Sequence, residues 1–155
     1  MSAFVWRGHV RNDWVDYNGH MGDFAYAAAF SQTVTAFMDR IGLDAAYRTE
    51  TEGTLYTLEM RIGYQRECHA GDALEIRLHI LATDARRMHL YLEMVNGAGE
   101  ALAWNEQVLM HVSRSGIKPR ATPFPPMTVQ RIAALAASSA PMDYPEHLGR
   151  PLGLH

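Results

Sequence analysis

Apolar and polar positions divide the chain into one helical stretch followed by a series of strand-like stretches. From Phe24 onward, apolar side chains recur every three or four residues, among them Phe30, Val34 and Ile41. This spacing is the period of an α-helix with one buried face. It predicts an amphipathic helix of about five turns that ends near Gly42, a residue suited to stopping a helix.

After a loose segment at residues 44–52, apolar and polar residues alternate with a period of two, which is typical of strands with one buried face. The predicted strands are Phe4–Val10, Thr54–Arg66, Leu74–Ile80, Met88–Met94 and Leu102–Val112. The expected buried face of the second is Tyr56, Leu58, Met60, Ile62 and Tyr64.

Short joins at residues 70–72, 84–86 and 96–99 predict hairpins between consecutive strands. Consecutive hairpins would give an antiparallel sheet with one apolar face in need of cover. The long helix can supply that cover. We therefore expect an α+β domain in which a curved antiparallel sheet of about five strands wraps around a central helix.

The character of the chain changes from Ser115 onward. Prolines at 119, 123, 125 and 126 interrupt regular structure, and a short helix is expected at Val129–Ala137. We therefore expect a domain at residues 1–114 and a Pro-rich C-terminal extension at residues 115–155. The extension is expected to pack on the domain or on a partner subunit.

Composition narrows the class of protein. A chain of 155 residues that is 48% hydrophobic can bury a core without disulfides, and Cys68 is its single cysteine. The N-terminus lacks a signal-peptide pattern and no apolar run reaches the length of a membrane span. A net charge of -3 with scattered basic residues argues against nucleic-acid binding. We expect a cytoplasmic protein with no membrane partner.

Candidate chemistry gathers in the loop before the long helix. Asp16 precedes the turn dipeptide Asn18–Gly19, then His20, and then Gly22–Asp23 at the start of the helix. A helix N-terminus carries unpaired N–H groups and partial positive charge. Asp16 could attack a carbonyl carbon or orient a water there, while the N–H of Gly22 or Asp23 polarises the carbonyl oxygen.

Simpler interpretations of the same residues remain open. Asp16 could only form an Asx turn over Asn18. His20 could be a general acid or base, but it is one of eight histidines, most of which are expected to be structural or exposed. No HExxH or clustered-ligand spacing is present, so we expect no metal site.

The segment Trp14-Val15-Asp16-Tyr17-Asn18-Gly19-His20-Met21, followed by a long helix and four strands, resembles the hotdog-fold thioesterases of the 4-hydroxybenzoyl-CoA thioesterase type. The resemblance implies hydrolysis of an acyl-CoA thioester without a metal or other cofactor. It implies that Asp16 is the nucleophile or general base and that Gly22–Asp23 polarises the thioester. Many relatives have Asn-Asn where this chain has Gly22–Asp23.

The same loop, with the Pro-rich tail, also resembles the betainyl-CoA thioesterases of carnitine degradation. The resemblance implies a cationic acyl group, and a trimethylammonium is bound by aromatic faces and a nearby carboxylate. The candidate substrate-binding residues are Trp14, Tyr17, Tyr26, Glu59 and Trp104. An alternative is that most of these aromatic residues are core residues.

CoA also brings phosphate groups, which arginine binds well. The candidate CoA-binding residues are Arg61, Arg66, Arg86, Arg87 and Arg114. The resemblance further implies a homodimer or homotetramer, in which pairing would protect an edge strand. Two other functions stay open: a hotdog acyl-CoA hydratase or dehydratase, and a non-catalytic acyl-CoA-binding module.

Overall fold

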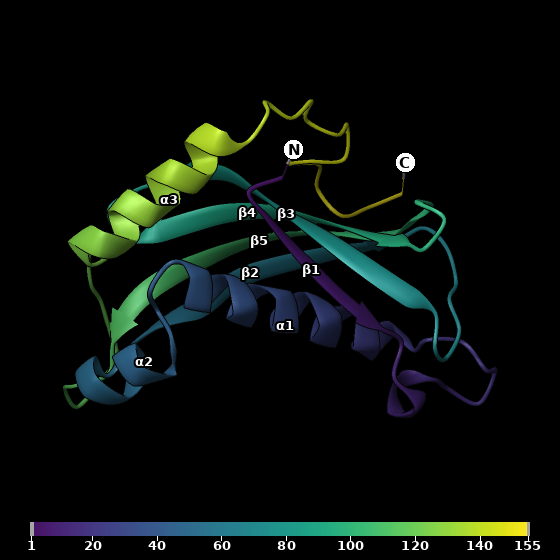
Figure 1. The fold of residues 1–155 in the computed structure, drawn as a ribbon, viewed down its shortest axis with the longest axis horizontal. Helices are drawn as coiled ribbons and strands as arrows, with labels where there is room; N and C mark the ends of the chain where they lie inside the picture. Colours follow the sequence, from purple (N-terminus) through teal and green to yellow (C-terminus); the bar gives the residue numbers. More distant parts are fainter. Residues whose placement is uncertain (1, 155) are drawn as a thin grey trace.

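A long helix, α1 (Asp23–Arg40), lies along one face of a curved antiparallel sheet in this computed structural model, which describes residues 2–154 (Figure 1). The five long strands are β1 (Phe4–His9), β2 (Gly53–Tyr64), β3 (Ala73–Thr83), β4 (Arg87–Asn96) and β5 (Ala101–Ser113). The predicted α+β architecture, a central helix wrapped by about five antiparallel strands, is confirmed.

The core lies between α1 and the concave face of the sheet. On α1, the buried side chains follow the predicted helical spacing and include Phe30, Val34 and Phe37. On β3 and β4, the predicted apolar faces are buried at Leu74, Ile76, Leu78, Met88, Leu90, Leu92 and Met94. Gly42 has a φ of +90°, which favours glycine just after the helix end.

The strand order is β1-β3-β4-β5-β2, so β2 pairs with β5 and not with β3. The expected hairpin at residues 70–72 is therefore wrong, whereas those joining β3 to β4 and β4 to β5 are confirmed. Gly71, with a φ of +83°, does make a turn there. A turn sequence shows that the chain bends, but it does not say which strand the next one will join. The segment from Gln65 to Asp72 consequently crosses between separated strands.

The expected buried face of β2 is also wrong in part. Tyr56, Leu58 and Tyr64 are 40%, 52% and 54% exposed. A bulge at Leu58 shifts the pairing with β5, so Tyr56 and Met60 face opposite sides of the sheet although both are even-numbered. Because β2 is also an edge strand, no further strand of this chain covers it.

The segment at residues 44–52 was expected to be loose, but most of it forms a short helix, α2 (Ala45–Thr51). Asp44 caps this helix, because its carboxylate accepts a hydrogen bond of 2.8 Å from the Tyr47 N–H. None of its residues is buried, so the helix lacks the apolar spacing by which a helix is recognised in a sequence.

After β5, a two-residue strand, β6 (Arg120–Ala121), pairs with β5, and α3 (Pro126–Ser138) follows. The helix α3 therefore starts three residues before the predicted Val129. Pro126 occupies its first position, where the missing proline N–H costs nothing. Phe124 and Ile132 belong to the same buried cluster as α1 and the sheet. The proposed domain boundary at residue 114 stays a prediction.

The chain beyond α3 returns across the outer face of the sheet, which is the face turned away from α1 (Figure 1). His147 stacks on Trp104 with ring centroids 4.0 Å apart, and its Nε2 lies 3.0 Å from the Tyr91 hydroxyl. Arg61 donates hydrogen bonds to the carbonyl oxygens of His147 and Arg150. Burial and the positive charge of Arg61 lower the pKa of His147, which favours a neutral imidazole in this contact.

None of the helices within residues 2–154 has the length and apolar character needed to cross a lipid bilayer.

Candidate active site

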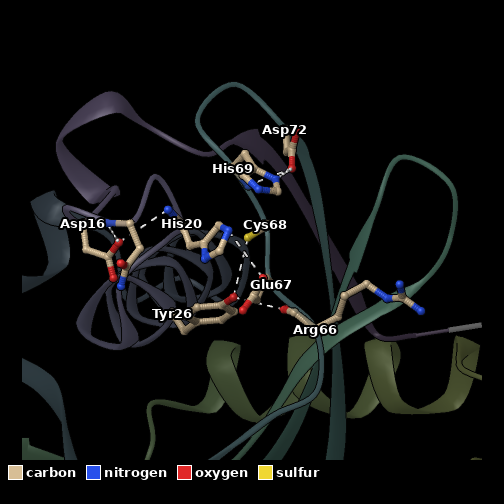
Figure 2. Close-up of polar contacts among 9 residues, drawn as sticks. Asp16, His20, Tyr26, Arg66, Glu67, Cys68, His69 and Asp72 are labelled. Carbon is tan, nitrogen blue, oxygen red and sulfur yellow. Dashed lines mark hydrogen bonds and ion pairs between the residues drawn. The ribbon is translucent and has the colours of Figure 1, made fainter.

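The loop before α1 folds back on itself as a narrow turn (Figure 2). Val15 and Met21 pair as an antiparallel bridge, and the Asp16 N–H donates to the His20 carbonyl at 2.8 Å. Gly19 closes the turn with a φ of +80° and donates to the Asp16 carbonyl at 3.0 Å. The predicted Asn-Gly turn therefore holds Asp16 and His20 at the two sides of one loop.

The Asp16 carboxylate is exposed and only partly engaged by its own loop. Its Oδ1 accepts a hydrogen bond of 2.8 Å from the Asn18 N–H, which forms the Asx turn that the sequence offered as an alternative. The same oxygen also accepts the backbone N–H of His20 at 3.4 Å. Among the described residues, Oδ2 has no hydrogen-bond partner. The turn therefore orients the carboxylate while leaving one oxygen able to reach a ligand.

The start of α1 offers fewer free donors than its sequence suggests. The Gly22 N–H donates to the Trp14 carbonyl at 2.9 Å, and the Phe24 N–H donates to the Asp23 side chain at 2.8 Å. The Ala25 N–H donates to the Gly22 carbonyl. Within residues 2–154, this leaves the Asp23 N–H as the unpaired donor of the first turn. A helix N-terminus concentrates partial positive charge at such a donor.

The crossover from β2 to β3 reaches this loop, which the sequence did not predict. The Met21 N–H donates to the Cys68 carbonyl at 2.8 Å, and His20 pairs with His69 as a backbone bridge. The His20 Nε2 lies 3.4 Å from a Glu67 carboxylate oxygen, and the His69 ring packs edge-on against His20 at 4.8 Å (Figure 2). No spacing in the sequence links residues 67–69 to residues 16–23.

The side chains of Tyr26, Tyr64 and Cys68 lie next to this loop and the start of α1. The Tyr26 hydroxyl donates to the Arg66 carbonyl at 3.2 Å and lies 3.6 Å from the Cys68 sulfur. Tyr64 packs edge-on against Tyr26 and donates to the Asp23 carbonyl at 3.1 Å. Burial raises the pKa of Tyr26, Tyr64 and Cys68, so all three stay protonated near neutral pH. Cys68 is therefore a poor nucleophile.

The candidate substrate-binding residues divide between two places. Trp14 is buried beneath the loop with the Arg11 guanidinium 5.6 Å from its ring, and Tyr17 is 96% exposed at the loop tip. Together with Tyr26, they lie at the candidate site. Glu59 and Trp104 instead lie on the outer face of the sheet, where Trp104 stacks on His147 of the C-terminal chain.

The candidate CoA-binding arginines are also dispersed. Arg66 lies nearest to the loop and forms an ion pair of 3.1 Å with Glu100. Arg61 binds the C-terminal chain on the outer face. Arg86 and Arg87 lie in the β3–β4 hairpin, and Arg114 follows β5, where its N–H donates to the end of α2. These last three do not join the group around Asp16.

No three His, Cys, Asp or Glu side chains gather closely enough to hold a metal ion anywhere between residues 2 and 154. The site instead combines an oriented carboxylate, a free N–H at a helix start and an imidazole. A carboxylate can attack or deprotonate, and an N–H can stabilise a developing oxyanion.

Comparison with known proteins identifies the family of the chain. Residues 10–132 match the family model described as the thioesterase-like superfamily. The chain is 39% identical over 146 residues to the betainyl-CoA thioesterase of Pseudomonas aeruginosa. That alignment covers 94% of this chain and 91% of the relative.

Solved structures show the same fold. A hypothetical protein of Staphylococcus aureus, solved in complex with CoA, superposes with a TM-score of 0.91 at 29% identity, over 98% of this chain and 95% of the other. A mutant 4-hydroxybenzoyl-CoA thioesterase superposes with a TM-score of 0.74 over 83% of this chain and 96% of its own, at 10% identity, which shows the fold alone. The chain therefore belongs to the thioesterase-like superfamily and is an acyl-CoA thioesterase with the hotdog fold.

Proposed function

We propose that the Asp16 carboxylate and the Asp23 N–H together cleave the acyl-CoA thioester. The observation that carries this proposal is the pairing pattern at the start of α1. One carboxylate oxygen of Asp16 and the N–H of Asp23 are unpaired within residues 2–154, while the neighbouring donors are occupied. A thioester needs both a nucleophile or base at its carbon and a donor at its oxygen.

Two routes fit these groups. Asp16 attacks the thioester carbon, expels CoA and forms a mixed anhydride that water then cleaves, or Asp16 removes a proton from a water that attacks directly. In both routes the carbonyl oxygen gains negative charge, and the Asp23 N–H and the helix N-terminus stabilise that charge. Tyr64 helps to hold the backbone of Asp23 in place, because its hydroxyl donates a hydrogen bond of 3.1 Å to the Asp23 carbonyl.

We propose a betainyl group as the acyl chain. The support is the 39% identity to a protein named betainyl-CoA thioesterase, in an alignment that spans nearly the whole of both chains. The exposed Tyr17 ring and the carboxylates of Asp16, Asp23 and Glu67 are groups of the kind that attract a trimethylammonium. We propose Arg66 as the first candidate for a CoA phosphate because it lies nearest to the loop, and we expect no cofactor.

Release of free CoA thiol from a panel of substrates tests this function. The panel contains betainyl-CoA, 4-hydroxybenzoyl-CoA, acetyl-CoA and a medium-chain acyl-CoA. We expect betainyl-CoA to give the highest kcat/KM. A higher value for a neutral acyl group would contradict the betainyl assignment. Folded protein that binds CoA but releases thiol from none of the four would favour a hydratase or a non-catalytic binding module.

We also propose that the protein is at least a dimer. β2 is a 12-residue edge strand with Tyr56 and Leu58 exposed, and such an edge is normally covered. Pairing with β2 of a second copy would cover it. Sedimentation at micromolar concentration should therefore show a dimer or tetramer, and a monomer at that concentration would count against the proposal.

A further inference from the structure

We infer that Glu67 is a positioning residue for His20 and that this pair takes the proton from the water that hydrolyses an Asp16 acyl anhydride. The inference rests on the proposed function and extends it to the second half of the reaction. It assigns a role to the crossover between β2 and β3, which the first half does not use.

The crossover between β2 and β3 is hydrogen-bonded to the loop that contains Asp16 and His20. Two backbone contacts join them, the His20–His69 bridge and the hydrogen bond from Met21 to Cys68. These contacts bring the Glu67 carboxylate to 3.4 Å from the His20 Nε2 (Figure 2). The distance is longer than a usual hydrogen bond. Such contacts are often long without substrate and tighten when it binds.

The side chains around His20 restrict how its ring can turn. The His69 ring packs against it at an interplanar angle of 73°, and His69 is itself held near Asp72, with Nδ1 3.7 Å from the Asp72 carboxylate. The His20 side chain is 34% exposed, so its ring is partly enclosed and partly open to solvent. The ring is therefore held between two neighbours while water can still reach it.

The contact with Glu67 also assigns the proton on the ring. If the His20 Nε2 carries the hydrogen and donates it to Glu67, the lone pair lies on Nδ1. Nδ1 has no partner among residues 2–154. The negative charge of Glu67 then stabilises the imidazolium that forms when Nδ1 accepts a proton. A carboxylate that orients a histidine base is the arrangement used in hydrolases with a covalent intermediate.

The reaction balances as two steps. First, an Asp16 carboxylate oxygen bonds to the thioester carbon, the carbon–sulfur bond breaks and CoA leaves as a thiolate. Water then attacks the acyl carbon of the anhydride, and the bond to Asp16 breaks to restore its carboxylate. One proton of the water passes to His20 and from there to solvent, the other is released with the product carboxylate, and the CoA thiolate takes up a proton from solvent. His20 acts only in the second step.

Because CoA release and anhydride hydrolysis are separate steps, the variant Glu67→Gln can test the role of Glu67 in the second one. Glutamine keeps an oxygen near His20 but removes the negative charge. Rapid-mixing measurement of thiol release from the substrate with the highest kcat/KM should show a burst of about one CoA per active site, followed by turnover at least about tenfold slower than wild type. The expected size is the lower part of the range for general acid–base groups. KM should not rise, and mass spectrometry during the burst should find the acyl group on the peptide containing Asp16.

Glu93→Gln is the matched control, because Glu93 also pairs with a histidine, His79, at 2.7 Å, but on the outer face of the sheet. It should behave as wild type. Unchanged turnover in Glu67→Gln would overturn the role of Glu67, and slower turnover without a burst or an acyl-enzyme would overturn the assignment to anhydride hydrolysis. Wild-type protein that releases no thiol would overturn the proposed function itself, which separates that failure from the other two.

Discussion

Replacing Asp16 with Asn is expected to lower kcat by on the order of a hundredfold or more, the range for losing a positioned nucleophile or base. The structure indicates that this substitution removes the charge of Asp16 without disturbing the turn. Asn keeps an Oδ1 that can accept the Asn18 N–H, so the Asx turn can persist while the negative charge and the nucleophile are lost. Steady-state thiol release by wild type and Asp16→Asn, compared side by side, measures the effect.

Thermal unfolding provides the control for Asp16→Asn, because a variant that keeps the turn should unfold near the wild-type temperature. If the folded variant turned over at the wild-type rate, Asp16 would be only a turn former. The variant does not separate the two routes, because asparagine can neither form the anhydride nor act as a base. Under either route, Asp16→Asn should therefore show no burst of CoA release of the kind expected for Glu67→Gln.

Removing the Asp23 N–H is the second large effect that we expect. Asp23→Pro deletes this donor at the first position of α1, where proline is well tolerated. Gly22 already has φ -68° and ψ 153°, the extended conformation that a residue before proline prefers. We expect kcat to fall about 10²–10³-fold, the usual effect of losing one oxyanion donor. Thiol release under saturating substrate measures it.

Asp23→Ala is the matched control, because it also lacks the carboxylate that binds the Phe24 N–H but keeps the backbone donor. The ratio of kcat between the Ala and Pro variants therefore isolates the N–H. Equal rates for the two variants would show that another donor polarises the thioester. The Gly22 N–H would then be the next candidate donor, and its hydrogen bond to the Trp14 carbonyl would have to break when substrate binds.

Prediction from sequence succeeded where the deciding interactions are local. The helix at residues 23–40 follows from apolar spacing, and the turn around Asp16 follows from Asn18–Gly19 and the Asx contact. The apolar faces of β3 and β4 follow from strict alternation. Each of these features depends on residues within a few positions of one another, so a short window of sequence contains its cause.

Prediction failed where a distant segment decides the outcome. The partner of β2 is β5, and a bulge at Leu58 reverses the exposure of Tyr56, neither of which a turn signal or an alternating pattern reveals. Trp104 and Glu59, candidate substrate-binding residues from the sequence, lie on the outer face of the sheet, away from the loop around Asp16, and their role in substrate binding stays a prediction. Their distance from the loop depends on which strands pair and on the side of the sheet that each strand position faces, which only the folded sheet decides.

The sequence by itself determined the class of fold, the turn around Asp16 and the start of the helix that follows it, because period, turn chemistry and helix capping act over short stretches of chain. Only the tertiary structure decided which groups of that loop remain available. In the folded chain the Gly22 N–H donates to the Trp14 carbonyl, whereas the Asp23 N–H is unpaired within the described residues. The crossover between the separated strands β2 and β3 brings Glu67 close to His20. Such contacts join residues far apart in the chain. Their free energy comes from the packing of the whole sheet, which no local pattern records.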